Sequence, residues 1–485
     1  MDYILAHCEP KTVFRYFEEI SRIPRGSGNE KAVSDYIAAF ARGLGLPVVQ
    51  DTAYNLVIRK PGTSGYENAP TVIIQGHMDM VCEKNKGTQH DFLKDPIRLV
   101  LDGDFIRADG TTLGGDNGVA IAYAMALLAS ADISHPPLEV LLTTDEEVGM
   151  GGAAAIDPSL LTGRILINID TDQEGVFDVS CAGGMRCATK FAFQQEPVPQ
   201  GLVAISIFIK GLKGGHSGME IHKERGNANR ILGRVLYSLL KQFDLRLAHI
   251  SGGAKDNAIP REAEAILLIK PEDMAGITAE TAELEQSLRH EYRTPDPNLQ
   301  ITVSLAQEAG DTAFEMKALP IIAAALNLTP TGIQHRSLEI EDLVETSSNI
   351  GIIRTEGHEI VVTCSLRSSV ISRKYDLENR LKLLAAVLGG TMTSIGDYPA
   401  WEYNPESPLR DLLIKTFTEM YHKEPVVEAI HAGLECGLFA EKWPGIDMIS
   451  FGPDILDVHT PEERMSIPSI HRTWNFLQAV LAKIR

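Results

Sequence analysis

The chain has 485 residues, more than a single hydrophobic core normally holds, so two or more domains are expected. With 44% hydrophobic and 23% charged residues, its composition is that of a globular protein. Its 65 Asp and Glu outnumber its 45 Lys and Arg, and the formal net charge of −20 argues against a nucleic-acid partner, because phosphate binding needs clustered basic residues.

The amino-terminal residues predict neither a secretory signal nor a membrane span. The stretch MDYILAHCEPKTVFRYFEEI contains several acids and no uninterrupted apolar run. The six cysteines of the chain lack the spacing of a metal site or a disulfide framework, so we interpret them as reduced. We therefore expect a cytoplasmic protein with no membrane partner.

The first part of the chain contains three short apolar runs that predict buried strands. They cover residues 71–75, 138–144 and 164–169, and each is bounded by Gly, Asp or Asn. Candidate ligands and proton acceptors follow these runs: His77 in GHMD, Glu146 and Glu147 in TTDEEVG, and Asp170 in NID. Because open α/β sheets carry functional groups at the carboxyl ends of their strands, we expect these side chains to share one sheet edge.

Asp116 precedes an apolar segment instead of following one. It lies in the turn GGDNG, directly before residues 118–130, whose Ala- and Leu-rich composition predicts a buried helix. A lone Asp at this place is usually an N-cap. The flanking glycines favour a metal ligand instead, because they permit positive φ angles and a close approach of the backbone.

Asp79 lies two residues after His77 and has two interpretations. It could accept the imidazole N–H of His77 and so fix the tautomer that leaves the other ring nitrogen for a metal ion. The alternative is a solvated carboxylate in a loop.

The last candidate ligand, His459 in DVHTPEE, lies far along the chain from Asp170, so the domain that holds both must be split in sequence. We expect its first part to cover residues 1–185 and its second part residues 401–485. The stretch YPAWEYNPESP supplies a Pro-rich boundary at the second junction. The final segment restores α/β character, and its predicted helices and strand cover residues 408–423, 446–452 and 469–485.

The intervening residues 186–400 predict an inserted α+β domain, with an antiparallel sheet covered on one side. Its first part predicts a strand, a helix and a second strand, which cover residues 202–212, 228–243 and 262–269 respectively. A hairpin and a helix follow, over residues 349–369 and 374–390. This similar order favours a duplication, and so a domain built from two α+β halves.

The candidate residues form a chemically coherent set. Two histidines and three carboxylates are the mixed nitrogen and oxygen ligands that suit a pair of zinc-like ions, with one carboxylate bridging them. Glu146 lies beside a proposed ligand, where a free carboxylate can accept a proton from water held by the metal.

The ordered motifs GHMD, GGDNG, TTDEEVG, NID, GGHSG and HTPEE resemble those of the M20 metallopeptidases, and the likeness covers nearly the whole chain. The resemblance implies an α/β fold, in which a mixed-sheet zinc-peptidase catalytic domain is split in sequence. It also implies that the inserted α+β domain is a lid and dimerisation domain, and hence a homodimer.

The resemblance assigns roles to the matching residues. His77 and Asp170 would bind one metal, Glu147 and His459 the other, and Asp116 would bridge the two. Glu146 would be the general base and Asp79 would orient His77. The peptide bond after Asp116 would be cis. The cofactor would be zinc, two ions per subunit, and cobalt or manganese could substitute because they accept the same ligands.

Further candidates lie outside the ligand set. His216 in GGHSG is a structural histidine or, by the resemblance, the residue that steadies the oxyanion from its own or a partner subunit. Asn257 in DNAIP and Arg367 in SLRSS are substrate ligands or exposed strand-end groups, and Arg is well shaped to clamp a carboxylate. His431 and Glu435 in HAGLECG line the substrate site by the resemblance, or merely begin a helix.

These residues predict an enzyme that hydrolyses the peptide bond of short unblocked dipeptides, with metal-activated water and Glu146 as base. A lid with a cationic clamp favours small substrates. The resemblance adds Xaa-His dipeptides such as carnosine. The alternatives are an N-acyl-amino-acid deacylase or a tripeptidase with the same ligands, or a catalytically silent metal-binding scaffold, which the intact Glu146 disfavours.

Overall fold

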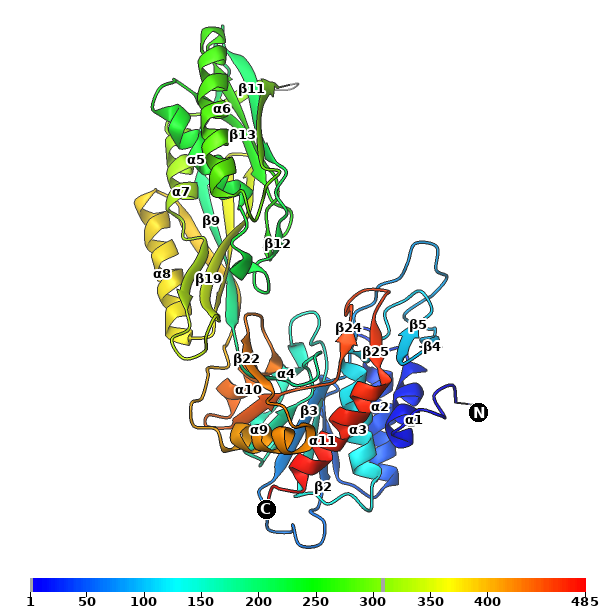
Figure 1. Ribbon diagram of the computed structural model, residues 1–485. Helices are drawn as coiled ribbons and strands as arrows, with labels where there is room; N and C mark the ends of the chain where they lie inside the picture. Colours follow the sequence, from blue (N-terminus) through cyan, green and yellow to red (C-terminus); the bar gives the residue numbers. More distant parts are fainter. Residues whose placement is uncertain (1–2, 307–309) are drawn as a thin grey trace. The chain divides into compact units, whose positions relative to one another are not determined.

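The computed structural model describes residues 3–306 and 310–485, which divide into two compact units (Figure 1). Unit 1 contains the residues up to Cys181 together with Tyr403–Ala429 and Leu434–Arg485. Unit 2 contains Ala182–Glu402 and Ile430–Gly433. The segment expected at 401–485 is therefore interrupted, because the four residues that include His431 belong to unit 2.

Unit 1 is built on an eight-stranded mixed sheet, which agrees with the predicted α/β class. In spatial order its strands are β1 (Val48–Gln50), β2 (Leu56–Lys60), β6 (Leu138–Thr143), β3 (Val72–His77), β7 (Ile165–Asn168), β23 (Asp447–Ser450), β8 (Val176–Cys181) and β22 (Val426–Ile430). The strands β6, β3, β7 and β23 are mutually parallel, whereas β2 and β8 flank them in antiparallel pairs. The three predicted apolar runs thus form neighbouring parallel strands.

Helices pack against this sheet (Figure 1). They are α1 (Lys11–Ser21), α2 (Lys31–Gly43), α3 (Gly115–Ala129), α4 (Gly151–Ala155), α9 (Pro408–Tyr421), α10 (Glu435–Lys442) and α11 (Ile467–Leu481). The helix α3 lies between α1 and β3, and its residues from Asn117 to Leu128 are buried, as its apolar composition predicts.

A small four-stranded sheet joins two distant parts of unit 1. Its order is β24 (Ile455–Leu456), β25 (Arg464–Ser466), β5 (Phe105–Ala108) and β4 (Leu99–Asp102). The loop between β24 and β25 carries His459, and β25 pairs with β5 a short way before Asp116 in the chain. This pairing brings the last predicted ligand back to the others.

Unit 2 contains a nine-stranded sheet in which every registered pair is antiparallel. Its strands are β16 (Gln300–Leu305), β11 (Val203–Lys210), β15 (Ala263–Ile269), β13 (Arg246–Gly252), β19 (Val344–Glu356), β20 (Glu359–Ser368), β9 (Gly183–Ala192) and β21 (Thr391–Tyr398), with β18 (Gly332–Arg336) paired to β19. Because β13 pairs with β19, the two predicted halves share one continuous sheet.

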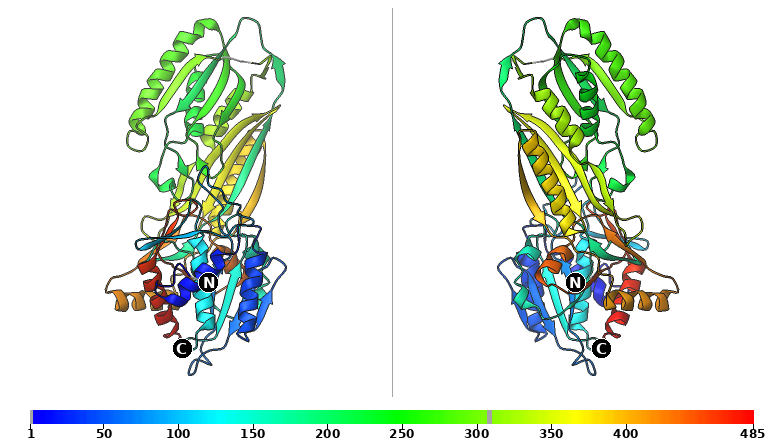
Figure 2. Two further views of the ribbon diagram at one scale, coloured as in Figure 1. Left: turned by 90° about the vertical axis from the view of Figure 1, so that its right-hand side faces the viewer. Right: turned by 90° about the vertical axis from the view of Figure 1, so that its left-hand side faces the viewer.

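Four helices share a single apolar core with that sheet and lie along one of its faces (Figure 2). They are α5 (Ala228–Leu240), α6 (Met274–Glu291), α7 (Ala318–Leu328) and α8 (Ile371–Val387). Two short ribbons complete unit 2: β10 (Gln195–Pro197) with β17 (Thr312–Phe314), and β12 (Gly215–His216) with β14 (Ala258–Ile259). Among the helices of the described residues, none has the length and apolar content that a bilayer crossing requires.

Candidate metal centre

The carboxyl ends of β3, β6 and β7 bring three predicted groups to one edge of the sheet in unit 1. His77 is the last residue of β3 and is opposite Thr143, the last residue of β6. The loop after β6 carries Glu146 and Glu147, and Asp170 follows β7 by two residues. The parallel arrangement of these strands is therefore the reason that residues far apart in sequence converge.

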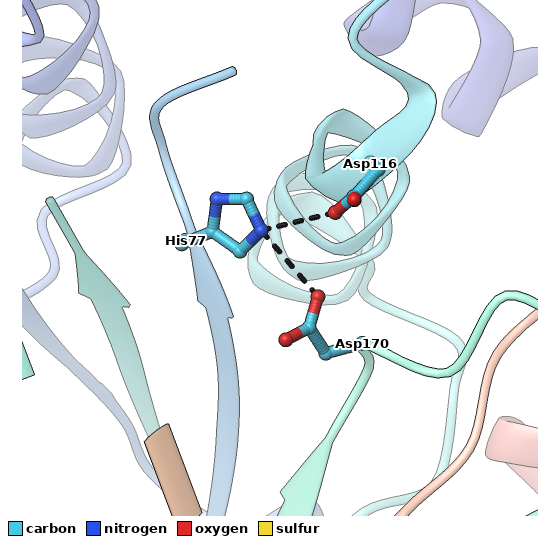
Figure 3. A group of neighbouring side chains, drawn as sticks. All are labelled: His77, Asp116 and Asp170. Atoms are coloured by element: carbon cyan, nitrogen blue, oxygen red, sulfur yellow. Dashed lines mark hydrogen bonds and ion pairs between the residues drawn. The ribbon is translucent and has the colours of Figure 1, made fainter. Parts of the chain in front are cut away.

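His77, Asp116 and Asp170 form the first cluster of possible ligands. The Nε2 atom of His77 lies 3.0 Å from Oδ1 of Asp116 and 3.4 Å from Oδ1 of Asp170 (Figure 3). The His77 side chain is only 1% exposed, so its ring is held rigidly at this edge.

Asp116, Glu147 and His459 form the second cluster. The Nε2 atom of His459 lies 3.2 Å from Oδ2 of Asp116 and 3.0 Å from Oε2 of Glu147. Asp116 thus turns one carboxylate oxygen to His77 and the other to His459. This is the geometry that a bridging carboxylate requires, and it brings together all five predicted ligands.

The structure does not support an N-cap role for Asp116. The N-cap position of α3 is Gly114, whose φ of 69° is left-handed, and no side chain caps it. Asp116 and Asn117 have non-helical backbone angles and are joined by a cis peptide bond. The amide of Asn117 donates to Oδ1 of Asp170 at 2.9 Å, a contact that sequence reasoning did not foresee.

Asp79 is fully buried, so it is not the solvated loop carboxylate that was its alternative. Its Oδ1 lies 3.3 Å from Nδ1 of His77. Its carboxylate also accepts hydrogen bonds from the backbone N–H of Glu146 at 3.1 Å, from that of Glu147 at 3.2 Å and from the hydroxyl of Ser27 at 2.8 Å. One carboxylate therefore lies against the ring of His77 and also holds the loop that carries both glutamates.

The electrostatics of the two clusters favour cations. Hydrogen bonds that the His459 ring donates to the carboxylates of Asp116 and Glu147 raise the pKa of His459 to about 11. Burial lowers the pKa of His77, but Asp170, Asp116 and Asp79 outweigh it and raise that pKa well above its usual value. Burial raises the pKa of Asp170 to about 6, although His77 opposes this change. Neighbouring acids raise the pKa values of both histidines and add to the burial effect at Asp170, and bound cations would relieve the repulsion among these acids.

The donor atoms fit a pair of metal ions. In each cluster the possible ligand atoms lie within 4.8 Å of one another, and Asp116 is common to both. The Oε1 atom of Glu147 is buried and accepts no hydrogen bond from the described residues. Imidazole and carboxylate donors of this kind suit zinc and chemically similar divalent ions.

Glu146 is absent from the two clusters that share Asp116, but it is near His77 and Glu147. Burial raises the pKa of its carboxyl well above the usual value, and Asp170 adds to the increase while His77 opposes it. A carboxylate next to the ligands, with a raised proton affinity, is suited to accept a proton from water.

In unit 2, His216, Arg367 and His431 form a polar cluster around Gly218. A Cβ atom at Gly218 would lie 2.5 Å from the carbonyl oxygen of His431, 3.0 Å from Nε of Arg367 and 3.1 Å from Cε1 of His216. The Nδ1 atom of His216 accepts backbone N–H groups of Gly218 and Met219, so Nε2 carries the proton of the neutral ring.

The rest of this cluster has the character of an anion site. Burial, together with Arg367 and His216, lowers the pKa of His431 to about 3, and its Nε2 lies 2.8 Å from the hydroxyl of Ser347. The Nε of Arg367 and the Nδ1 of His431 are buried without a hydrogen-bond partner among the described residues. Asn257 is exposed in the loop before β14, where its backbone carbonyl accepts a hydrogen bond from the N–H of Ser217.

Glu435 belongs to unit 1, where it is fully buried and is the first residue of α10, so it begins a helix as one of its two interpretations predicted. Its carboxyl accepts hydrogen bonds from the amide of Gln75 at 2.5 Å and from the hydroxyl of Thr143 at 2.7 Å. Burial raises its pKa to about 8. These contacts place Glu435 beside the strand ends that carry the ligands, and they favour a supporting role.

The chain matches known proteins over most of its length. The family model described as peptidase family M20/M25/M40 matches residues 73–483. The chain belongs to this peptidase family. It is 38% identical to the cytosol non-specific dipeptidase of Escherichia coli, over 99% of each chain. The crystal structure of aminoacylhistidine dipeptidase from Vibrio alginolyticus is 38% identical, with a TM-score of 0.93 over 99% of this chain and 98% of that one.

A more distant structure shares the fold alone. A tripeptidase from Staphylococcus aureus is 16% identical, with a TM-score of 0.57 over 98% of this chain and 99% of that one. The predicted membership of the M20 family, the α/β fold and the assignment as a hydrolase acting on peptide bonds are confirmed by these matches.

Proposed function

We propose that the protein is a dinuclear-metal dipeptidase that hydrolyses short unblocked dipeptides, Xaa-His types such as carnosine among them. The observation that carries this proposal is the Asp116 carboxylate, which turns its two oxygens to two different histidines at 3.0 and 3.2 Å. The dipeptidase names of the two relatives at 38% identity support the substrate class.

The ligand residues would hold two zinc ions per subunit. His77, Asp170 and Asp116 would hold one ion, and Glu147, His459 and Asp116 the other. When bound, the ions would supply Lewis acidity that lowers the pKa of water and polarises the peptide carbonyl. Asp79 keeps Nε2 of His77 directed at the site, because it faces the other ring nitrogen.

Glu146 is the proposed general base. Its carboxylate accepts the proton of the attacking water and then delivers that proton to the leaving amine, so the C–N bond breaks without release of a free amide anion. The hydrogen bond from its backbone N–H to Asp79 fixes the loop from which it acts. Cobalt or manganese could replace zinc without any change in these roles.

The polar cluster of unit 2 is proposed to bind substrate. Arg367 has a free, buried Nε donor among the described residues, and His431 is held neutral beside it. A guanidinium with a neutral histidine suits a carboxylate, the group that distinguishes an unblocked peptide. His216 presents an Nε2–H donor, which suits stabilisation of an oxyanion. Asn257 is proposed as a further substrate ligand.

The proposal also covers the oligomeric state of the protein and its location in the cell. We propose a homodimer located in the cytoplasm, in line with the name of the relative from Escherichia coli. Size-exclusion chromatography with light scattering measures the mass directly. A monomer at micromolar concentration would contradict the proposed dimer and leave the proposed chemistry intact.

A substrate panel tests the function. The protein, prepared without metal and then loaded with zinc, is assayed against dipeptides, carnosine, tripeptides and N-acyl amino acids. We expect hydrolysis of dipeptides that a chelator abolishes and zinc restores. A preference for tripeptides or acylated amino acids would overturn the substrate class, and the absence of any turnover by the zinc-loaded protein would favour a metal-binding scaffold.

A further inference from the structure

Glu463, the last residue of the HTPEE motif, holds the backbone of the loop that carries Asp116. Its buried carboxylate accepts four backbone N–H groups with both of its oxygens. The donors are Leu113 at 2.7 Å, Gly114 at 3.0 Å, Gly115 at 2.7 Å and Asp116 at 3.3 Å. A single side chain therefore sets the path of this loop.

Arg25 holds the same loop from its carbonyl side and joins it to the end of β3. Arg25 is only 2% exposed, and its guanidinium donates to the carbonyl oxygens of Met78 and Asp79, both at 3.0 Å, and to that of Gly114. The carbonyl oxygen of Gly114 thus accepts a hydrogen bond from Arg25, and the N–H of Gly114 donates one to Glu463. The two charged side chains fix the loop between the residues that follow His77 and the segment that follows His459.

The glycines of the loop leave room for this arrangement and for little else. A Cβ atom at Gly114 would lie 2.6 Å from the guanidinium of Arg25. At Gly115 it would lie 2.6 Å from Met465 and 3.2 Å from Oε1 of Glu463. The glycines of the GGDNG motif therefore allow these two side chains to approach the backbone closely. They also permit the left-handed φ of Gly114.

We propose that Glu463 and Arg25 are positioning residues that act through Asp116 and keep its two oxygens directed at both metal sites. The inference rests on the proposed dinuclear function. A bridging carboxylate must satisfy two ions at once, so a small displacement of its backbone weakens both sites. Because Glu463 lies four residues after His459, the segment that supplies a ligand to one site also anchors the ligand shared by both.

The alternative is that both residues only stabilise the fold. A purely structural role would change the free energy of unfolding and leave the metal affinity of the folded protein unchanged. The metal affinity of folded, metal-free protein therefore separates the two roles, and it does not depend on an activity assay.

The test uses Glu463→Gln, Arg25→Lys and the matched control Glu462→Gln in the full chain. Glu462 is the exposed neighbour of Glu463, and its carboxylate accepts a long hydrogen bond, 3.4 Å, from the amide of Asn85. Zinc and cobalt are titrated into each metal-free protein after circular dichroism has shown that it is folded, and the absorption of bound cobalt reports the ligand geometry.

We expect Glu463→Gln and Arg25→Lys to weaken binding of both metal equivalents by about 10- to 100-fold, with an altered cobalt spectrum, and Glu462→Gln to bind within about twofold of wild type. Wild-type affinity and spectrum in either folded variant overturn the proposal, and so does the failure of both variants to fold. A wild-type protein that binds no metal pair would instead overturn the proposed function itself.

Discussion

His459 in unit 1 and His431 in unit 2 lie in opposite electrostatic environments. In unit 1, Asp116 and Glu147 raise the pKa of His459 to about 11, whereas burial with Arg367 and His216 lowers the pKa of His431 in unit 2 to about 3. The first environment collects carboxylates and favours cations. The second collects cationic and neutral donors and favours an anion. The same type of side chain thus has pKa values shifted in opposite directions because its neighbours differ.

The largest effect should follow loss of the cations that unit 1 favours. Chelation should lower dipeptide turnover more than about 10⁴-fold, because the uncatalysed reaction is very slow.

Asp116→Asn should bind neither metal equivalent tightly, as it removes the charge common to both clusters. Atomic absorption and turnover are measured beside Asp102→Asn, a control at an exposed position. Retention of both ions by Asp116→Asn would contradict the bridging role.

A smaller loss is expected when the base is removed and the ligands remain. Glu146→Gln should reduce kcat by about 10²- to 10⁴-fold, because the amide cannot accept a proton. Its metal content should stay at the wild-type value, since the Asp116 clusters do not include Glu146. Normal turnover with normal metal content would show that another residue is the base.

The anion-favouring environment of unit 2 predicts a change in KM. Arg367→Lys should raise KM for dipeptides by about 10- to 100-fold, because an ammonium cannot reproduce the planar guanidinium donors. The penalty should be much smaller for dipeptides with an amidated carboxyl terminus. Arg354→Lys, at a pair with Glu356 in β19, is the matched control. An equal penalty for free and amidated substrates would contradict carboxylate recognition.

The smallest expected effect is on the free energy of unfolding, and it concerns the buried carboxyl of Glu435 in unit 1. Glu435 has a folded-state pKa of about 8, raised above its ordinary value of 4.5. The folded protein therefore keeps a proton that the unfolded chain loses, and stability from this group falls as pH rises between those values. Glu435→Gln lacks this titratable carboxyl, so its free energy of unfolding lacks this contribution to the pH dependence.

Relative to wild type, the free energy of unfolding of metal-free Glu435→Gln should therefore increase by more than about 1 kcal/mol from pH 5 to pH 8. Urea titrations at the two pH values measure the difference. A constant difference between the two proteins would show that the carboxyl of Glu435 is already ionised in the folded state at the lower pH.

The sequence predicted that His77, Glu147 and Asp170 converge, because local patterns carried the signal. Apolar runs marked where β3, β6 and β7 end, and the groups that follow neighbouring parallel strands must converge. Glu435 shows the limit of this reasoning. Its setting between glycine-containing turns resembles a binding loop, yet the side chain is directed into the sheet toward Gln75 and Thr143. Burial depends on packing that the local pattern does not encode.

The sequence by itself determined which candidate residues could supply the chemistry, because candidate ligands and bases are recognised by side-chain type and by their places after predicted strands. Only the tertiary structure decided how these residues are held: which oxygen of Asp116 faces which histidine, which ring nitrogen of His216 bears the proton, and that Arg25 and Glu463 enclose one loop. Such partners are separated by long stretches of chain, so their hydrogen bonds exist only once the fold has brought them together.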